Sequence, residues 1–233
     1  MSTPAPIIVV TGTGTEVGKT IATAALAVGL QEQRLRVAVV KPCQTGLQPG
    51  EDGDLAVVDR LAGGVETVEL VRLPDPLSPD AAARHTGREL PPVPVLASQI
   101  AQVARRDDVD IVLVEGAGGL LVRLDLAGGT LADLALCLQE LGLTVGVIVV
   151  ATAGLGTLNH SALTAEALQL RGLECLGFVI GSWPESPGLA ERLNVDDLPA
   201  VTGAPLLGKV PEGAGSWDPQ TFQDRAGAWL PIL

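Results

Sequence analysis

Short runs of apolar, often β-branched residues alternate along the chain with longer segments rich in alanine and leucine. The runs are almost continuously apolar, which is typical of parallel strands whose two faces are both covered by helices. The runs that predict strands are Ile7–Val10, Val37–Val40, Ile111–Val114, Val145–Val150, Leu176–Ile180 and Leu206–Val210. The segments between them predict helices at Thr20–Glu32, Val93–Arg106, Thr130–Leu141 and Asn159–Leu170, with a last helix from Pro219.

This alternation predicts an α/β fold with a doubly wound, mostly parallel sheet, because strand–helix–strand connections are right-handed. In such sheets ligands bind at the carboxyl ends of the strands. The proline-rich stretch Val71–Leu96 interrupts the alternation, and we interpret it as an excursion over the surface. With 233 residues, 47% of them hydrophobic, the chain can bury a full core. We therefore expect a single domain over residues 1–233.

Composition and charge narrow the range of partners. The formal net charge of −12 disfavours binding to nucleic acid, because a phosphate backbone attracts a basic surface. The opening residues MSTPAP lack the basic and apolar regions of a secretion signal, and no apolar stretch is long enough to span a membrane. The three cysteines show no C-x-x-C spacing, so they suggest neither a disulfide framework nor a zinc site. We expect a cytoplasmic protein without a membrane partner.

The segment TGTGTEVGKT, residues 11–20, follows the first strand and opens the first helix. Strand, glycine-rich loop and helix in this order are the context of a phosphate-binding loop, or P-loop. Its main-chain amides would surround phosphates, Lys19 would reach the outer phosphates, and the Thr20 hydroxyl could bind magnesium. An ordinary glycine-rich turn would explain the glycines but not the Lys-Thr pair. The usual spacing places glycine where Thr13 stands, so the loop is one residue longer between its glycines.

Two further candidates follow the second strand. Lys41 stands at its carboxyl end, where a second cation could stabilise a transferring phosphoryl group. A lysine that merely marks the exit of the strand into solvent is an equally good interpretation at this point. Asp54, in the sequence EDGDL, precedes an apolar-periodic stretch. It is either a metal ligand or a helix N-cap.

The third predicted strand ends in VEGAGG, which includes Glu115. A carboxylate at the end of an apolar strand is the arrangement that holds the magnesium ion of a nucleotide, and the adjacent glycines permit close approach of a ligand. The alternative is a turn that happens to carry one acid. After the fourth strand, the segment 154–159 is another glycine-containing loop that opens a helix and is a possible anion site.

Seven motifs in fixed order resemble those of the dethiobiotin synthetase family over essentially the whole chain. They are TGTGTEVGKT, KPCQTG, EDGDL, VEGAGGLLV, GLGTLNH, IGSWP and KVPEG. The resemblance implies a P-loop NTPase-like fold and an ATP- and Mg²⁺-dependent homodimer. It also implies the activity: closure of a ureido ring on 7,8-diaminononanoate with CO₂, through a carbamate and a carbamic-phosphoric mixed anhydride.

The resemblance also implies the roles of individual residues. Lys41 would be the catalytic lysine, and Thr20, Asp54 and Glu115 would surround Mg²⁺. The nucleotide would be bound by Glu16, Val17, Gly18, Lys19, Thr20, Ile21, Asp54, Glu115, Gly116, Ala117, Gly118, Gly181, Ser182, Pro211, Glu212 and Gly213. The diamine or its carbamate would be bound by Thr15, Lys19, Thr45, Gly118 and Gly119, and its carboxylate by Leu155, Gly156, Thr157, Leu158 and Asn159 of the partner subunit.

Two other kinds of protein share this type of loop. Nucleotide switches of the MinD/ParA kind carry an additional lysine near the start of the loop, where this chain has Thr11-Gly12-Thr13. Amidotransferase-type synthetases that act on cobyrinate or cobyric acid need a glutaminase region with a reactive cysteine, and this chain is too short to hold both parts. An ATP-dependent ligase therefore remains the favoured interpretation.

Overall fold

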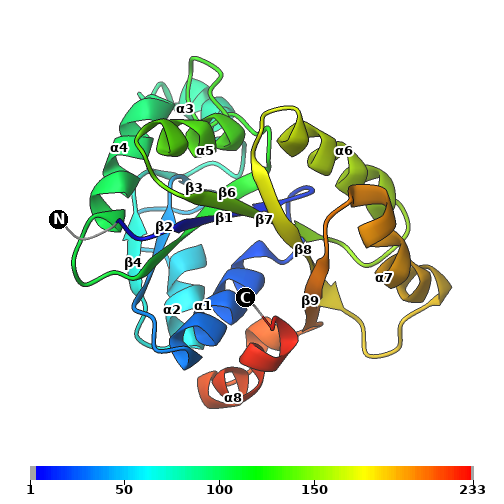
Figure 1. Ribbon diagram of the computed structural model, residues 1–233. Coiled ribbons are helices and arrows are strands. Elements are labelled where there is room, and N and C mark those ends of the chain that lie inside the picture. Colours follow the sequence, from blue (N-terminus) through cyan, green and yellow to red (C-terminus); the bar gives the residue numbers. More distant parts are fainter. Residues whose placement is uncertain (1–3, 232–233) are drawn as a thin grey trace.

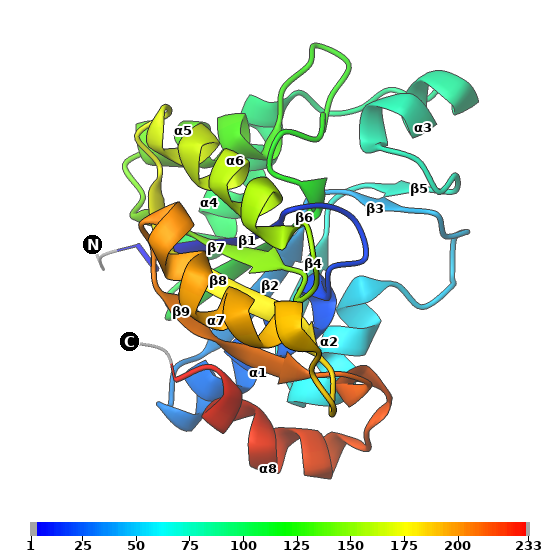
Figure 2. The ribbon, with the colours of Figure 1, turned by 90° about the vertical axis from the view of Figure 1, so that its right-hand side faces the viewer.

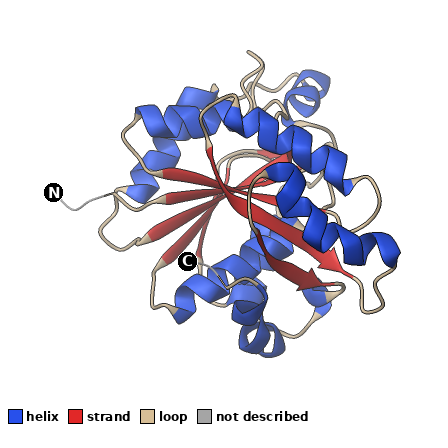
Figure 3. Ribbon diagram, turned by 45° about the vertical axis from the view of Figure 1, so that its right-hand side comes forward, coloured by secondary structure: helices blue, strands red, loops and turns tan. Residues whose placement is uncertain are grey.

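The computed structural model describes residues 4–231 and shows a twisted parallel sheet with helices on both faces (Figures 1 and 3). Within these residues the main sheet has seven strands in the order β4-β2-β6-β1-β7-β8-β9, and neighbouring strands run parallel. The strands are β1 (Ile7–Gly12), β2 (Val37–Lys41), β4 (Glu66–Glu69), β6 (Ile111–Gly119), β7 (Val145–Ala151), β8 (Glu174–Trp183) and β9 (Leu206–Pro211). The predicted doubly wound α/β fold is confirmed.

Helices cover the sheet in two layers. Below it in Figure 1 lie α1 (Lys19–Glu32), α2 (Asp54–Ala62) and α8 (Pro219–Trp229). Above it lie α4 (Val93–Ala104), α5 (Leu131–Glu140) and α6 (Thr157–Gln169), while α7 (Leu189–Thr202) packs against α6 beside β9. The sheet therefore separates two apolar cores, one on each face.

Strand β1 shows how the sequence fills both cores. Ile7 and Val9 belong to the core under α4 and α5, whereas Ile8 and Val10 belong to the core under α1 and α2. Side chains of a strand alternate between its two faces, so a strand buried on both sides must be apolar at every position. This is why the strands appear in the sequence as unbroken apolar runs.

All the predicted strands and helices are present, with ends displaced by a few residues. Two elements of the main fold had no signal in the apolar pattern. Strand β4 has the sequence ETVE, is not fully buried and forms the edge of the sheet beside β2. Helix α7 buries only Asn194 and Leu198 and contains Pro199, so it has no strong apolar periodicity.

The segment around Val71–Leu96 leaves the main sheet, as expected, but it is not a plain surface excursion (Figure 2). Strand β5 (Arg72–Leu73) pairs with β3 (Gln44–Thr45), and helix α3 (Pro79–Thr86) follows. Leu73, Ala82, Ala83 and Leu90 form a small separate apolar cluster. This cluster fixes the segment beside the carboxyl ends of the central strands.

No helix within residues 4–231 is both long enough and apolar enough to cross a bilayer. Residues 1–3 and 232–233 lie outside the described residues. The beginning of the MSTPAP segment and the two ends of the expected domain 1–233 therefore belong to the part that the structure does not describe.

Candidate nucleotide and metal site

The loop between β1 and α1 folds as a phosphate-binding loop requires. Gly18 has φ 92°, a left-handed conformation that favours glycine, and Glu16 also has a positive φ of 59°. The Lys19 side chain lies along the loop and donates a hydrogen bond to the main-chain oxygen of Gly14 at 2.9 Å. Helix α1 begins at Lys19, so its amino-terminal amides adjoin the loop. The loop thus combines a lysine with the positive end of a helix.

The loop is packed tightly against the end of β8. A Cβ atom on Gly181 would overlap the main-chain oxygen of Val17, and a Cβ atom on Gly18 would overlap that of Gly181. Two glycines from distant parts of the sequence are therefore needed at one contact between main chains. This contact places Gly181 and Ser182 beside the phosphate-binding loop.

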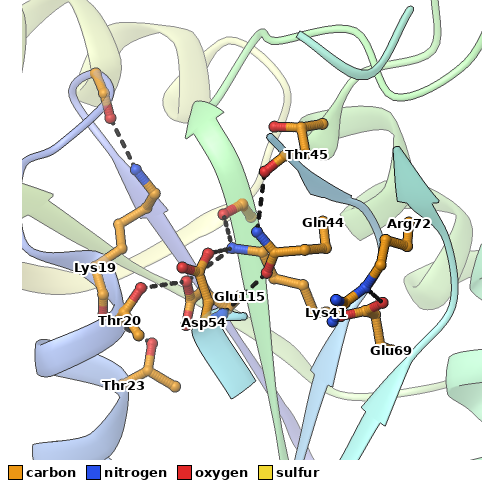
Figure 4. Close-up of polar contacts among 12 residues, drawn as sticks. Lys19, Thr20, Thr23, Lys41, Gln44, Thr45, Asp54, Glu69, Arg72 and Glu115 are labelled. Atoms are coloured by element: carbon orange, nitrogen blue, oxygen red, sulfur yellow. Dashed lines mark hydrogen bonds and ion pairs between the residues drawn. The ribbon is translucent and has the colours of Figure 1, made fainter. Parts of the chain in front are cut away.

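Four polar side chains converge beside the loop (Figure 4). The Lys41 Nζ atom lies 2.5 Å from Asp54 Oδ2 and 2.8 Å from Glu115 Oε1. The Thr20 hydroxyl donates a hydrogen bond to Glu115 Oε1 at 2.9 Å. Lys41 also donates to the main-chain oxygen of Gly116 at 3.3 Å. The four side chains form one hydrogen-bonded cluster, which we call the lysine–carboxylate cluster: Thr20, Lys41, Asp54 and Glu115.

Strand order explains this convergence. Strands β2 and β6 are neighbours and pair Val40 with Val114, so Lys41 and Glu115 follow directly at their carboxyl ends. Strand β1 lies on the other side of β6 and pairs Val10 with Glu115. The helix that follows β1 consequently brings Thr20 to the same carboxylate. The solvent-exit interpretation of Lys41 is wrong, because the residue is only 2% exposed.

Asp54 is not a helix N-cap, which corrects one of the two interpretations of that residue. The N-cap of α2 is Gly53, and Asp54 is the first helical residue. Its main-chain amide donates to the side-chain oxygen of Gln44 at 3.0 Å. The carboxylate is thereby free to face Lys41.

Gln44 is a buried residue that the sequence interpretation missed as a contributor to the site. Its side-chain amide also donates to the main-chain oxygen of Thr45 at 3.2 Å. The side chain therefore bridges the KPCQTG segment and the start of α2. The position of Gln44 within the KPCQTG motif could have marked it as a site residue, but the motif does not indicate which group its side chain contacts.

The charges at the site affect one another. Burial lowers the pKa of Lys19, and the positive charge of Lys41 lowers it further. Burial also opposes the charge on Lys41, but the carboxylates of Glu115 and Asp54 outweigh it and raise the pKa of Lys41 above its ordinary value. Lys41 is therefore an ammonium ion at neutral pH. Burial raises the pKa of the neighbouring Cys43 thiol to about 12, so this cysteine is a neutral thiol.

The cluster has an unused acceptor. Glu115 is fully buried, and within the described part of the chain its Oε2 atom has no hydrogen-bond partner. A buried carboxylate oxygen without a partner is costly unless a cation or a donor reaches it. Oxygen ligands from two carboxylates and a hydroxyl are those that Mg²⁺ prefers. The residues present therefore fit a divalent cation.

A cavity of about 710 Å³ joins the phosphate-binding loop to this cluster. The expected residues that line it are Thr15, Glu16, Gly18, Lys19, Thr20, Ile21, Lys41, Thr45, Asp54, Glu115, Gly116, Ala117 and Gly118. Its far wall is formed by Pro76–Pro79, which the sequence had placed in a surface excursion. The cavity is large enough for a small organic ligand.

Other expected residues lie outside this cavity. Gly119 lines a second cavity of about 400 Å³ between the phosphate-binding loop and α6. Pro211, Glu212 and Gly213 follow β9, and the Glu212 amide donates to the main-chain oxygen of Trp183 at 2.8 Å. The expected carboxylate-binding segment, Leu155–Asn159, lines neither cavity in this chain. Helix α6 begins within that segment, at Thr157, two residues before the predicted start.

Comparison with known proteins identifies the family of the chain. Residues 7–220 match a family model described as an AAA domain. A relative from Saccharopolyspora erythraea, named ATP-dependent dethiobiotin synthetase BioD, is 58% identical over 96% of this chain and 95% of its own length. A relative of the same name from Rhodococcus jostii is 55% identical over 96% of this chain and 94% of its own length.

Solved structures show the same fold at low sequence identity. Chloroplast FtsY from Physcomitrella patens has a TM-score of 0.58 at 21% identity, over 97% of this chain and 66% of that one. MinD from Pyrococcus horikoshii, solved with Mg-ADP, has a TM-score of 0.56 at 18% identity, over 96% of this chain and 91% of that one. These likenesses establish a P-loop NTPase fold. The family is shown by the high sequence identities to the two dethiobiotin synthetases. The chain belongs to the family of ATP-dependent dethiobiotin synthetases.

Proposed function

We propose that this biotin-pathway, ATP-dependent ligase converts 7,8-diaminononanoate and CO₂ to dethiobiotin, with release of ADP and phosphate. One amine of the substrate adds CO₂ to form a carbamate and loses a proton. A carbamate oxygen then attacks the γ-phosphorus, and ADP leaves. The second amine attacks the carbonyl carbon of this mixed anhydride and loses a proton. The C–O bond to the phosphoryl group breaks, phosphate leaves with that oxygen, and the ring closes. The observation that carries the proposal is the junction of the phosphate-binding loop and the lysine–carboxylate cluster in one cavity.

The nucleotide phosphates would bind the loop from Glu16 to Ile21, with main-chain amides and Lys19 as their contacts. The Gly116–Gly118 segment would lie along the same phosphates and the substrate. The base would lie between the end of β8, at Gly181 and Ser182, and the turn after β9, at Pro211–Gly213. The contact of Gly181 with Val17 supports this position of the base, because it places the end of β8 next to the phosphate-binding loop.

Mg²⁺ would be held by Thr20, Asp54 and Glu115. Support comes from the convergence of the two carboxylates on one ammonium group and from the unpartnered Oε2 atom of Glu115. When bound, the ion supplies positive charge that stabilises phosphate oxygens. Lys41 offsets only one of the two carboxylate charges, so the cluster keeps a negative charge for the ion, and a bound ion would free Lys41 to contact the substrate.

Lys41 would be the catalytic residue. Its ammonium group is buried and its pKa is raised, so it carries the positive charge that a carbamate and a transferring phosphoryl group require. The reaction needs no protein nucleophile, because the attacking atoms belong to the substrate. Positioning and electrostatic stabilisation are then the main contributions of the enzyme.

The diamine would bind at Thr15, Thr45, Gly118 and Gly119, and a homodimer would complete the site. Leu121, Leu155 and Leu163 are 49%, 95% and 56% exposed. Leu121 and Leu163 line the second cavity, beside Gly119. Exposed leucines around a cavity are typical of a surface that another chain covers. The Leu155–Asn159 segment of the partner subunit would bind the substrate carboxylate through the start of α6.

The decisive experiment mixes the protein with ATP, Mg²⁺ and bicarbonate and measures ADP release before and after addition of the diamine. We expect release to depend on the diamine, with dethiobiotin appearing in equal amount. Lys41→Ala should lower turnover by about 100-fold or more while nucleotide binding persists, as for loss of an electrostatic stabiliser. Arg105→Ala is a matched control, because this exposed arginine bonds a main-chain oxygen of Leu141 away from the site. A rate of ADP release that is the same with and without the diamine would contradict the proposal.

A further inference from the structure

Arg60 makes an unusual pair of contacts at the end of helix α2. Its two terminal nitrogens donate to main-chain oxygens, NH1 to Trp217 at 3.1 Å and NH2 to Gly215 at 2.6 Å. Both oxygens belong to the turn that follows β9, around the short 3₁₀ helix Ala214–Ser216. Arginine presents several donors in a fixed plane, so one side chain can hold two carbonyls of a turn. Arg60 thus fastens this turn to α2 from a distance of more than 150 positions in the sequence.

The same turn packs against a residue that lines the larger cavity. A Cβ atom on Gly215 would lie only 2.7 Å from Ile21 Cδ1, and Ile21 lines the cavity. The residue before the turn, Glu212, is bonded to the end of β8 through the main-chain oxygen of Trp183. Residues 212–215 therefore contact α1, whose Ile21 lines the cavity, and the end of β8, which is expected to flank the base.

The turn has a second anchor on its far side. The Trp217 ring packs edge-on against Trp229, with 5.4 Å between centroids, and the Arg225 guanidinium lies 5.5 Å from the centre of the Trp217 ring. These contacts hold the side chain of Trp217 on helix α8. Arg60 instead holds the main chain, including Gly215 next to Ile21. Loss of Arg60 would leave the turn attached but free to shift at the cavity side.

Helix α2 therefore has a polar contact with the site at each end. Its first residue, Asp54, belongs to the lysine–carboxylate cluster, and Arg60 lies in its last turn. Arg60 is exposed, and single exposed polar contacts contribute little to global stability. Its contacts fall on Gly215 and Trp217, in the turn that directly follows the residues expected to frame the base, so the consequence of removing it should be local.

We propose that Arg60 is a positioning residue for recognition of the nucleotide base: it orders the 213–217 turn and thereby sets the affinity and selectivity of the base end of the site. This rests on the proposed function, which places the base beside Pro211–Gly213, the residues that lead into that turn. A turn that is ordered before binding loses less conformational entropy when the ligand arrives. The phosphate end, around Lys19 and Thr20, does not contact Arg60 and should be unaffected.

The test uses equilibrium binding to separate the contribution of the base end of the site from that of the phosphate end. Affinities of wild type, Arg60→Ala and Arg60→Lys are measured for the Mg²⁺ complexes of a non-hydrolysable ATP analogue, of its GTP, CTP and UTP counterparts, and of inorganic tripolyphosphate, which has no base. Arg105→Ala serves as the matched control, because it also removes an exposed arginine that bonds a main-chain oxygen. Thermal unfolding and circular dichroism verify that each variant is folded.

We expect Arg60→Ala to weaken binding of the preferred nucleotide by about 10-fold, the equivalent of losing one to two hydrogen bonds, and to move the ratios among the four nucleotides toward one. Tripolyphosphate should bind as in wild type, and Arg60→Lys, which retains one donor group, should lie between the two. Unchanged nucleotide affinity would overturn the proposal, and so would equal weakening of tripolyphosphate. Because binding is measured without the diamine, failure of the ligase assay and failure of this proposal are separate results.

Discussion

Replacing Lys41 with methionine should make the stability of the protein depend on a bound cation. The substitution keeps an unbranched apolar stem but removes the ammonium group that lies 2.8 Å from Glu115 Oε1. Glu115 is fully buried and, among residues 4–231, would retain only the hydroxyl of Thr20 as a donor, at 2.9 Å. Its charge would then be poorly compensated in the interior of the protein.

The magnitude follows from the cost of an uncompensated buried charge. Breaking a buried ion pair by removing one partner costs about 3–5 kcal/mol, and the remaining hydroxyl donor from Thr20 favours the lower end of this range. We expect Lys41→Met to lower the free energy of unfolding by about 3 kcal/mol and the melting temperature by roughly 6–12 °C.

The assay is thermal and urea unfolding in EDTA and in excess Mg-ADP. Magnesium should raise the melting temperature of Lys41→Met more than that of wild type, because in the variant no ammonium group competes for the carboxylates. In EDTA, Lys19→Met is a matched control: Lys19 is also buried, but its ammonium group donates to a main-chain oxygen of Gly14 and not to a carboxylate.

A double-mutant cycle with Glu115→Gln isolates the pair. The neutral amide needs no cation, so the cost of Lys41→Met should fall to about 1 kcal/mol in that background. A melting temperature of Lys41→Met within about 2 °C of wild type in EDTA would refute the reasoning, since it corresponds to less than about 1 kcal/mol. An equal effect of Lys41→Met in both backgrounds would also refute it.

Three further predictions follow from close contacts and exposure. Gly181→Ala should destabilise the fold and abolish nucleotide binding in a thermal-shift titration, because its Cβ atom would overlap Val17. In the control Gly142→Ala the new Cβ atom would meet open space, so stability should fall only by the cost of a positive φ at alanine. Cys43, whose pKa is raised to about 12, should resist iodoacetamide at pH 8 in the native protein and react after unfolding, as peptide mass spectrometry would show. Leu163→Asp should shift the proposed dimer toward monomer in sedimentation velocity, and an unchanged sedimentation coefficient would count against the α6 surface as the interface.

The sequence predicts those parts of the structure that depend on the local pattern of apolar and polar residues. Unbroken apolar runs marked the buried strands, and each candidate of the cluster except Asp54 could be placed at a strand end or at the start of a helix. Asp54 needed either the family resemblance or the structure, because its position depends on how the chain returns after β3. Gln44 was missed for the same reason: its bond to the Asp54 amide joins two segments whose separation in space no local pattern specifies.

The missed elements share a physical cause. Strand β4 is a polar edge, and helix α7 buries little apolar surface, so neither has the periodicity by which sequence reveals structure. The wall formed by Pro76–Pro79 is positioned by a small apolar cluster and not by the main sheet. The positions of residues that depend on such packing cannot be predicted from the sequence pattern and require the folded structure.

The parallel pairing of β2 with β6 constrains how the enzyme can be altered. Lys41 and Glu115 follow paired positions on adjacent strands, so their separation is set by the main-chain ladder and not by loop length. Insertion of one residue within either strand would turn its terminal side chain to the opposite face of the sheet and disconnect the two charges. Changes of length should therefore be tolerated in the connections, such as the loop after Gly46, and be fatal to catalysis within these two strands. A library of single-residue insertions scored by growth without biotin would map that boundary directly.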